Sequence, residues 1–154
     1  MSYIDDNLVP GEQVVYRARL HWIIFAVPAA FLVLGIVFLA LWRGNPDLAF
    51  LAYLGGLCVA IGLVVGLSRA ITFSSSEFAV TNKRVLIKVG FVRRHSLELV
   101  LQKVEGIGVD QDVAGRLFGY GTITVTGTGG TRETFPRIAG PLEFRRHVQA
   151  SVAP

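Results

Sequence analysis

Charged residues are scarce in this sequence: they make up 17% of its 154 residues, while 52% are apolar, and a soluble domain is usually about a quarter charged. The shortage is local, because residues 22–42 and 48–67 contain no Asp, Glu, Lys or Arg. A helix of about 20 residues is about 30 Å long and matches the hydrocarbon core of a bilayer. The sequence therefore predicts two transmembrane spans. It argues against a secreted domain, a basic nucleic-acid-binding protein and a soluble single-domain enzyme.

Clusters of residues typical of catalytic or metal sites are also lacking. Cys58 is the only cysteine and lies within the second span, which excludes an internal disulfide and a thiolate metal site. The histidines are isolated in the sequence, with no His-x-x-x-His spacing; they are His21, His95 and His147. We therefore expect no enzyme activity, no metal and no cofactor.

Two shorter patterns have structural explanations. The glycine-rich segment 127–130 is followed by neither Lys-Ser nor Lys-Thr, so it predicts a hairpin turn and not a phosphate-binding loop. Asp110 and Asp112 are close together, and we interpret them as a solvated strand end or a helix cap.

The break between the two apolar stretches is only five residues long. Residues 43–47 read Arg-Gly-Asn-Pro-Asp, a turn-forming sequence that can join only antiparallel neighbours. Arg17 and Arg19 precede the first span and Arg69 follows the second, while the turn has one arginine. The positive-inside rule therefore predicts a hairpin with both termini in the cytoplasm.

Small residues recur along one face of the second span, at spacings of three or four: Gly55, Cys58, Gly62 and Gly66. Small residues allow membrane helices to approach closely. The face therefore predicts helix packing, either against the first span of the same chain or against a second copy in a homodimer.

After the second span the periodicity changes from helical to alternating. Short alternating runs predict six strands, which the turn signals and short links make antiparallel: residues 77–81, 85–89, 94–99, 104–109, 122–126 and 131–135. Within residues 115–121 we expect one helical turn that buries Leu117 and Phe118. Apolar residues every four positions after Pro141 predict a C-terminal helix. The fold class is therefore α+β.

The sequence resembles the bacterial pleckstrin-homology-like (PH-like) membrane proteins along almost its whole length. The segments that carry the resemblance are Pro10-Gly11-Glu12, Arg19-Leu20-His21-Trp22, Phe78-Ala79-Val80-Thr81-Asn82-Lys83-Arg84-Val85, Gly90-Phe91 and residues 115–123. The resemblance implies a transmembrane hairpin followed by a small antiparallel PH-like barrel or sandwich of seven strands, capped by a C-terminal helix. The expected organisation is an N-terminal cytoplasmic segment 1–21, a hairpin 22–67, a polar linker 68–76 and a PH-like domain 77–154.

Basic residues are concentrated in the early part of the expected sheet domain: Lys83, Arg84, Lys88, Arg93, Arg94 and Lys103. Each cation near an anionic leaflet contributes about 1 kcal/mol of attraction. We interpret this basic face as a candidate surface for anionic phospholipid or a protein partner, or as a solvated face without a ligand.

Three functional hypotheses follow. The first is a membrane-anchored adaptor that binds a protein partner, or a neighbouring copy as a homo-oligomer, through a strand edge or groove. The second is a sensor of anionic lipid or of the state of the envelope, and the third is an accessory subunit of a larger membrane complex. No nucleic-acid partner is expected.

Overall fold

The computed structural model describes residues 3–90 and 95–152. The chain forms two compact units. One unit is helical and consists of residues 22–74, and the other combines the chain before Trp22 with the chain after Ser74. The second unit is therefore built from two segments that are separated by the expected transmembrane hairpin.

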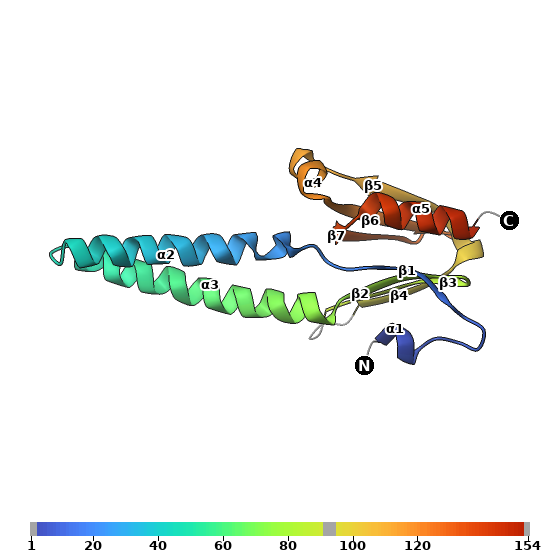
Figure 1. Ribbon diagram of the computed structural model, residues 1–154, viewed down its shortest axis with the longest axis horizontal. Helices are drawn as coiled ribbons and strands as arrows, with labels where there is room; N and C mark the ends of the chain where they lie inside the picture. Colours follow the sequence, from blue (N-terminus) through green and yellow to red (C-terminus); the bar gives the residue numbers. More distant parts are fainter. Residues whose placement is uncertain (1–2, 91–94, 153–154) are drawn as a thin grey trace. The chain divides into compact units, whose positions relative to one another are not determined.

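The helical unit contains two long antiparallel helices joined by a short turn (Figure 1). Its elements are η1 (Trp22–Phe25), α2 (Ala26–Gly44) and α3 (Ala49–Ser75). Both candidate spans are strongly apolar, with mean hydropathies of 2.8 and 2.3, yet only 17% and 22% of their most apolar windows are buried. The core helices of a soluble protein would bury most of these residues, so both helices are candidate membrane spans.

Residues 68–75, which we expected to form a polar linker, are instead the last turns of α3. Hydroxyl groups in this segment donate to carbonyl groups of the same helix: Thr72 Oγ1 to Ser68 O at 3.0 Å and Ser74 Oγ to Ile71 O at 3.1 Å. Such bonds within the helix satisfy polar side chains without ending it. The polar composition was therefore a poor guide to the helix boundary.

The other unit contains two antiparallel sheets, with strand orders β1-β2-β3-β4 and β5-β6-β7. The strands are β1 (Val14–Ala18), β2 (Glu77–Thr81), β3 (Arg84–Val89), β4 (His95–Val100), β5 (Val104–Asp110), β6 (Tyr120–Gly127) and β7 (Arg132–Ala139). The helices are α1 (Tyr3–Asp6), η2 (Leu101–Lys103), α4 (Val113–Phe118) and α5 (Pro141–Val152). The α+β fold, with six of its strands and the C-terminal helix, is confirmed.

The seventh strand, β1, comes from the segment before the first candidate span. It pairs with β2 in antiparallel register, with Ala18 opposite Phe78 and Val14 opposite Thr81. Residues 1–21, which we expected to be separate from the sheet domain, are part of it. Strand pairing depends on a partner more than 60 residues away, which local alternation does not reveal.

The centre of the first sheet is buried on both faces. Phe78 faces the second sheet, where its ring lies 6.0 Å from that of Phe135 in a T-shaped contact. Ala79 and Leu86 face the opposite way and form a buried cluster with Ile4 of α1. The N-terminal helix therefore covers a sheet face that would otherwise be exposed to water.

The chain leaves and re-enters this unit at one end of the sheets. Leu20 forms a single bridge with Ile138 of β7, and the His21 N–H donates to Arg137 O at 2.7 Å. His21 is the last residue of the unit before Trp22, and Glu77 begins β2 shortly after α3. We call this the chain-exit end; the far end is where β2 turns into β3, at Asn82.

Helix α4 lies between β5 and β6 at the chain-exit end. Asp112 caps its N-terminus by accepting from Gly115 N–H at 2.5 Å, and Gly119 ends it with a φ of 78°. The expected burial of Leu117 and Phe118 is wrong, because Leu117 is 78% exposed and Phe118 is 49% exposed. The buried face of α4 is Gly115, where a Cβ would come within 2.6 Å of Tyr120 O, so the large apolar residues point outward.

Candidate functional site

Two of the sequence motifs, about 70 residues apart, meet at the far end of the first sheet. Glu12 is 7% exposed. Its Oε1 accepts from Arg84 Nε at 3.0 Å and from the Thr81 hydroxyl at 2.7 Å. Its Oε2 accepts from Arg84 Nη2 at 3.0 Å and from the Val9 N–H at 2.9 Å. A buried carboxylate needs such a set of donors to remain ionised.

The rest of the Thr81–Arg84 motif also binds the N-terminal segment. The Asn82 side chain accepts from the Gln13 N–H at 2.9 Å and donates to Gly11 O at 3.2 Å. Lys83 Nζ donates to Pro10 O at 2.9 Å. We call Glu12, Thr81, Asn82, Lys83 and Arg84 the clasp, because they join the segment before the hairpin to the sheet after it.

The ionisation of Glu12 is strongly stabilised by the clasp. Burial alone would raise the pKa of this carboxyl, but hydrogen bonds from Arg84, the Val9 N–H and the Thr81 hydroxyl, with the charge of Arg84, outweigh burial and lower the pKa from 4.5 to about 2. Glu12 is therefore an acceptor at neutral pH, with a structural role that its position in the sequence did not indicate.

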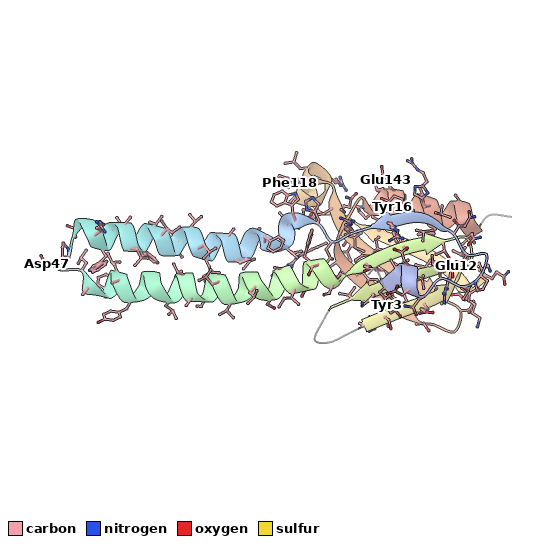
Figure 2. The ribbon with its side chains drawn as sticks, turned by 60° about the horizontal axis from the view of Figure 1, so that its bottom comes forward. Tyr3, Glu12, Tyr16, Asp47, Phe118 and Glu143 are labelled. Carbon is pink, nitrogen blue, oxygen red and sulfur yellow. The ribbon has the colours of Figure 1, made fainter. Side chains whose placement is uncertain are left out.

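Helix α1 is fastened to the same sheet by further polar contacts. The Glu77 carboxylate accepts from the Tyr3 and Ile4 N–H groups, both at 3.1 Å, and so caps the helix. Lys88 Nζ lies 4.5 Å from the centre of the Tyr3 ring. Figure 2 shows Tyr3 and Glu12 in the N-terminal segment beside the first sheet.

The residues of the expected basic face lie at both ends of the domain, and several of them take part in the contacts described above. Arg84 and Lys83 belong to the clasp at the far end, where Lys103 of η2 also lies, and Lys88 contacts Tyr3 nearer the chain-exit end. Arg93 and Arg94 lie outside the described residues. The four described cations therefore do not form a single patch, and three of them already have partners within the domain.

A groove runs between β5 and the last turns of α5. It is lined by Val104, Glu105, Gly106, Ile107, Val148, Gln149 and Val152. A second hollow continues round the end of α5, with Val152 in common. Among the strands that the structure describes, β5 is hydrogen-bonded to β6 alone, so its other edge faces the groove. Figure 1 shows α5 beside β5 and β6.

Comparison with known families identifies this fold. The family model described as "Bacterial PH domain" matches residues 19–152. The chain belongs to the bacterial PH domain family. No curated protein and no solved structure matches the chain. In this bacterial PH domain, α1, β1 and Glu12 precede the matched range, so the segment that completes the first sheet lies outside it.

Gly106, in the groove of this bacterial PH domain, has more free space around it than Gly121 and Gly127. A Cβ at Gly121 would lie 2.8 Å from Asp110 O, and one at Gly127 would lie 3.0 Å from Leu99, so internal packing explains both glycines. A Cβ at Gly106 would meet nothing within 4 Å, and Gly106 does not have a positive φ. A glycine within a strand is typical of a bulge, and the β5–β6 register shifts between Val104 and Gly106; it is also typical of a place where another backbone or a ligand approaches closely.

The small-residue face of α3 lies against α2 within the helical unit. A Cβ at Gly55 would come within 3.0 Å of Gly35 O, and one at Gly62 within 2.8 Å of the Leu32 side chain. Cys58 is also buried. Gly66 is looser, because its Cβ would lie 3.6 Å from Pro28. The two helices therefore approach each other more closely at Gly55 and Gly35 than at Gly66 and Pro28.

Sequence reasoning missed both Glu12 and Gly106. The Pro10-Gly11-Glu12 motif was part of the family resemblance, but a single acidic residue has no recognisable role until its partner is known. One signal was available: the uninterrupted apolar runs in β2 and β3 are typical of strands buried on both faces, which requires a covering element. Among residues 3–90 and 95–152, no group of three His, Cys, Asp or Glu side chains could hold a metal ion.

Proposed function

We propose that this protein is a membrane-anchored adaptor of the cytoplasmic leaflet. Its bacterial PH domain would bind an extended segment of a partner protein, or of a neighbouring copy, along the groove between β5 and α5. The two-helix hairpin would hold the domain at the bacterial inner membrane, so that binding concentrates the partner there.

Membrane insertion is supported by the apolar surface of the helical unit. Both candidate spans, of 23 and 27 residues, are longer than the roughly 20 residues needed to cross a bilayer, and most of their apolar surface is exposed. Large exposed apolar surfaces on helices are unstable in water and favourable in lipid.

The pairing of β1 with β2 supports a topology with both flanks of the hairpin on one side. These flanks belong to one folded sheet, which cannot lie on both sides of a bilayer. Arg17, Arg19 and Arg69 flank the spans, against Arg43 alone in the short turn. Because positive charge favours the cytoplasmic side, this distribution of arginines supports a cytoplasmic domain.

The edge of β5 is the single observation that carries the adaptor function. An added strand gains main-chain hydrogen bonds from an exposed sheet edge, and the apolar wall of a neighbouring helix gives specificity. Here Val148 and Val152 of α5 supply such a wall, and Gly106 leaves room for a close backbone approach.

The adaptor is better supported than a sensor of anionic lipid. Three of the four described cations of the expected basic face already have partners within the domain. Lys83 Nζ donates to Pro10 O, Arg84 forms an ion pair with Glu12, and Lys88 lies over the Tyr3 ring.

Site-specific photo-cross-linking in membranes tests the adaptor. A photoreactive residue in place of Gln149, which lies in the groove, is expected to form a discrete adduct in the full-length protein. Gly106→Val should reduce the adduct several-fold, because its side chain fills the groove while remaining compatible with a strand. An adduct of twice the chain mass would identify a second copy, and a different discrete mass a partner protein.

The matched control is Ser96→Val, which adds the same side chain to an exposed position of the edge strand β4 in the other sheet. It should leave the adduct unchanged. If no adduct forms, or if Ser96→Val abolishes it while Gly106→Val does not, binding along β5 is wrong.

A further inference from the structure

Helix α4 carries a group of apolar side chains that are exposed on the surface of the domain. The exposed fractions are 84% for Val113, 78% for Leu117 and 49% for Phe118. Single exposed apolar residues are ordinary, but three within a six-residue helix form a local apolar surface, which is typical of an interaction site.

The exposed surface is held by a rigid helix. Asp112 caps one end, and Gly119 closes the other with a hydrogen bond from its N–H to Gly115 O at 2.8 Å. The Gln111 side chain donates to Tyr120 O at 2.8 Å and fixes the connection to β6. These contacts fix the orientation of the helix, so Val113 and Leu117 are held on its exposed side.

The position of α4 indicates what covers this surface. The ring of Tyr120, directly after the C-cap, lies 5.4 Å from the ring of His21, and His21 immediately precedes the first candidate span. The Gly140 N–H also donates to Gly119 O at 3.0 Å, beside the Ala139–Arg19 hydrogen bond. Figure 2 shows Phe118 and Glu12 at opposite ends of the domain. The apolar surface is thus at the end from which the chain continues into the membrane.

We infer that α4 is an interfacial membrane anchor: Val113, Leu117 and Phe118 insert into the boundary between headgroups and acyl chains of the bilayer that holds the hairpin. This inference rests on the membrane insertion proposed above. Amphipathic helices that lie in the interface bury their apolar face by about 5 to 10 Å. The long side chain of Arg116 can extend from the same helix to a lipid phosphate.

The consequence of this anchor is a fixed orientation of the domain. The strands run from the chain-exit end to the far end, so a domain held by α4 as well as by the hairpin presents its far end to the cytoplasm. The groove includes the first residues of β5 and the last turns of α5, which lie toward that far end. α4 would therefore keep the β5 edge accessible to a partner.

Lipid-quenching measurements on the full-length protein test the anchor. Cys58→Ser removes the only cysteine, and Leu117→Cys then carries an environment-sensitive fluorophore in vesicles of phosphatidylethanolamine and phosphatidylglycerol. Lipids with a quencher near the headgroup should quench this probe several-fold more than the same probe at Thr128→Cys, an exposed position in the β6–β7 turn. Equal quenching at the two positions would overturn the anchor.

A third label separates failure of the anchor from failure of membrane insertion. Val64 of α3 is 70% exposed. A fluorophore on Val64→Cys should be quenched by lipids that carry the quencher deep in the acyl chains. If Val64 is quenched and Leu117 is not, the hairpin is inserted and the α4 anchor is wrong. If neither is quenched, the membrane-anchored function itself fails. A blue-shifted Leu117 probe that no lipid quenches would identify protein as the cover and also overturn the anchor.

Discussion

Glu12 is the side chain that joins the segment before the helical hairpin to the strands that follow it. Its carboxylate is almost fully buried and accepts hydrogen bonds from the Arg84 guanidinium, the Thr81 hydroxyl and the Val9 N–H. Removing the charge of one partner leaves the other partner poorly compensated in a buried position. The stability of the domain should therefore depend on the ionisation of this group.

The first prediction concerns that ionisation. The pKa of Glu12 is lowered to about 2 in the folded domain, from an ordinary value of 4.5. Its stabilising contribution is therefore complete above about pH 4.5 and is lost as the pH falls toward 2. Glu12→Gln should lower the free energy of unfolding by about 2 kcal/mol at neutral pH, the usual strength of hydrogen bonds to a charged group.

Pulse proteolysis of the purified protein in detergent, at graded urea concentrations, measures this difference. The gap between wild type and Glu12→Gln should narrow between pH 4.5 and 2. Asp5→Asn, which removes the exposed ion pair with Arg17, is the control and should cost less than about 1 kcal/mol. A gap that does not change with pH would show that Glu12 is not ionised in the folded protein.

Small residues allow the two long helices to pack closely against each other. Gly35 and Gly55 bring the backbones of α2 and α3 close enough that a Cβ on either residue would lie within about 3 Å of the other's carbonyl oxygen. A backbone atom cannot move aside as easily as the end of a flexible side chain. This contact is therefore the least tolerant part of the hairpin.

The second prediction compares two alanine substitutions in these helices. Gly35→Ala places a methyl group 2.9 Å from Gly55 O and 2.7 Å from Val59. The overpacking, about 1 to 3 kcal/mol, should exceed the gain of about 1 kcal/mol in helix propensity. At Gly66 the new methyl group has an ordinary contact at 3.6 Å, so Gly66→Ala should be neutral or stabilising. Thermal unfolding in detergent, followed by the fluorescence of Trp22 and Trp42, distinguishes the two, and equal midpoints would contradict the packing.

In the molecule as a whole, a helical hairpin interrupts the chain between two adjacent strands of one sheet. β1 and β2 are adjacent in the first sheet, but the residues between them form the helical unit. A fragment that starts after the second span would leave Ala79 and Leu86 without the cover of α1, and would leave Glu77 and Arg84 without their N-terminal partners. The domain is therefore complete only when both segments are present.

The third prediction tests this completeness with two soluble proteins. Residues 1–21 joined to residues 75–154 through a Gly/Ser linker of about ten residues, with a mean span of about 17 Å, should fold cooperatively. Residues 75–154 alone should be largely unfolded. The dispersion of amide signals in NMR spectra provides the measurement, and a well-folded shorter fragment would show that β1 and the clasp are dispensable.

Local sequence patterns were sufficient for the elements that depend on their own residues. Charge-free stretches of about 20 residues indicated the two long helices, and alternation located six strands to within a few residues. The pattern failed at β1, at the end of α3 and in the expected burial of Leu117 and Phe118 on α4. In each case the outcome depended on a distant partner or on hydrogen bonds within the helix that composition does not report.

The sequence by itself determined two long apolar helices followed by an antiparallel sheet domain, because hydrophobic length and periodicity are local properties of the chain. The tertiary structure alone decided that the hairpin interrupts a sheet, that Glu12 binds Arg84 and that α4 turns its apolar residues outward. These features join residues that are far apart in the chain or depend on which face a neighbour covers. Only the folded arrangement of the chain specifies such contacts.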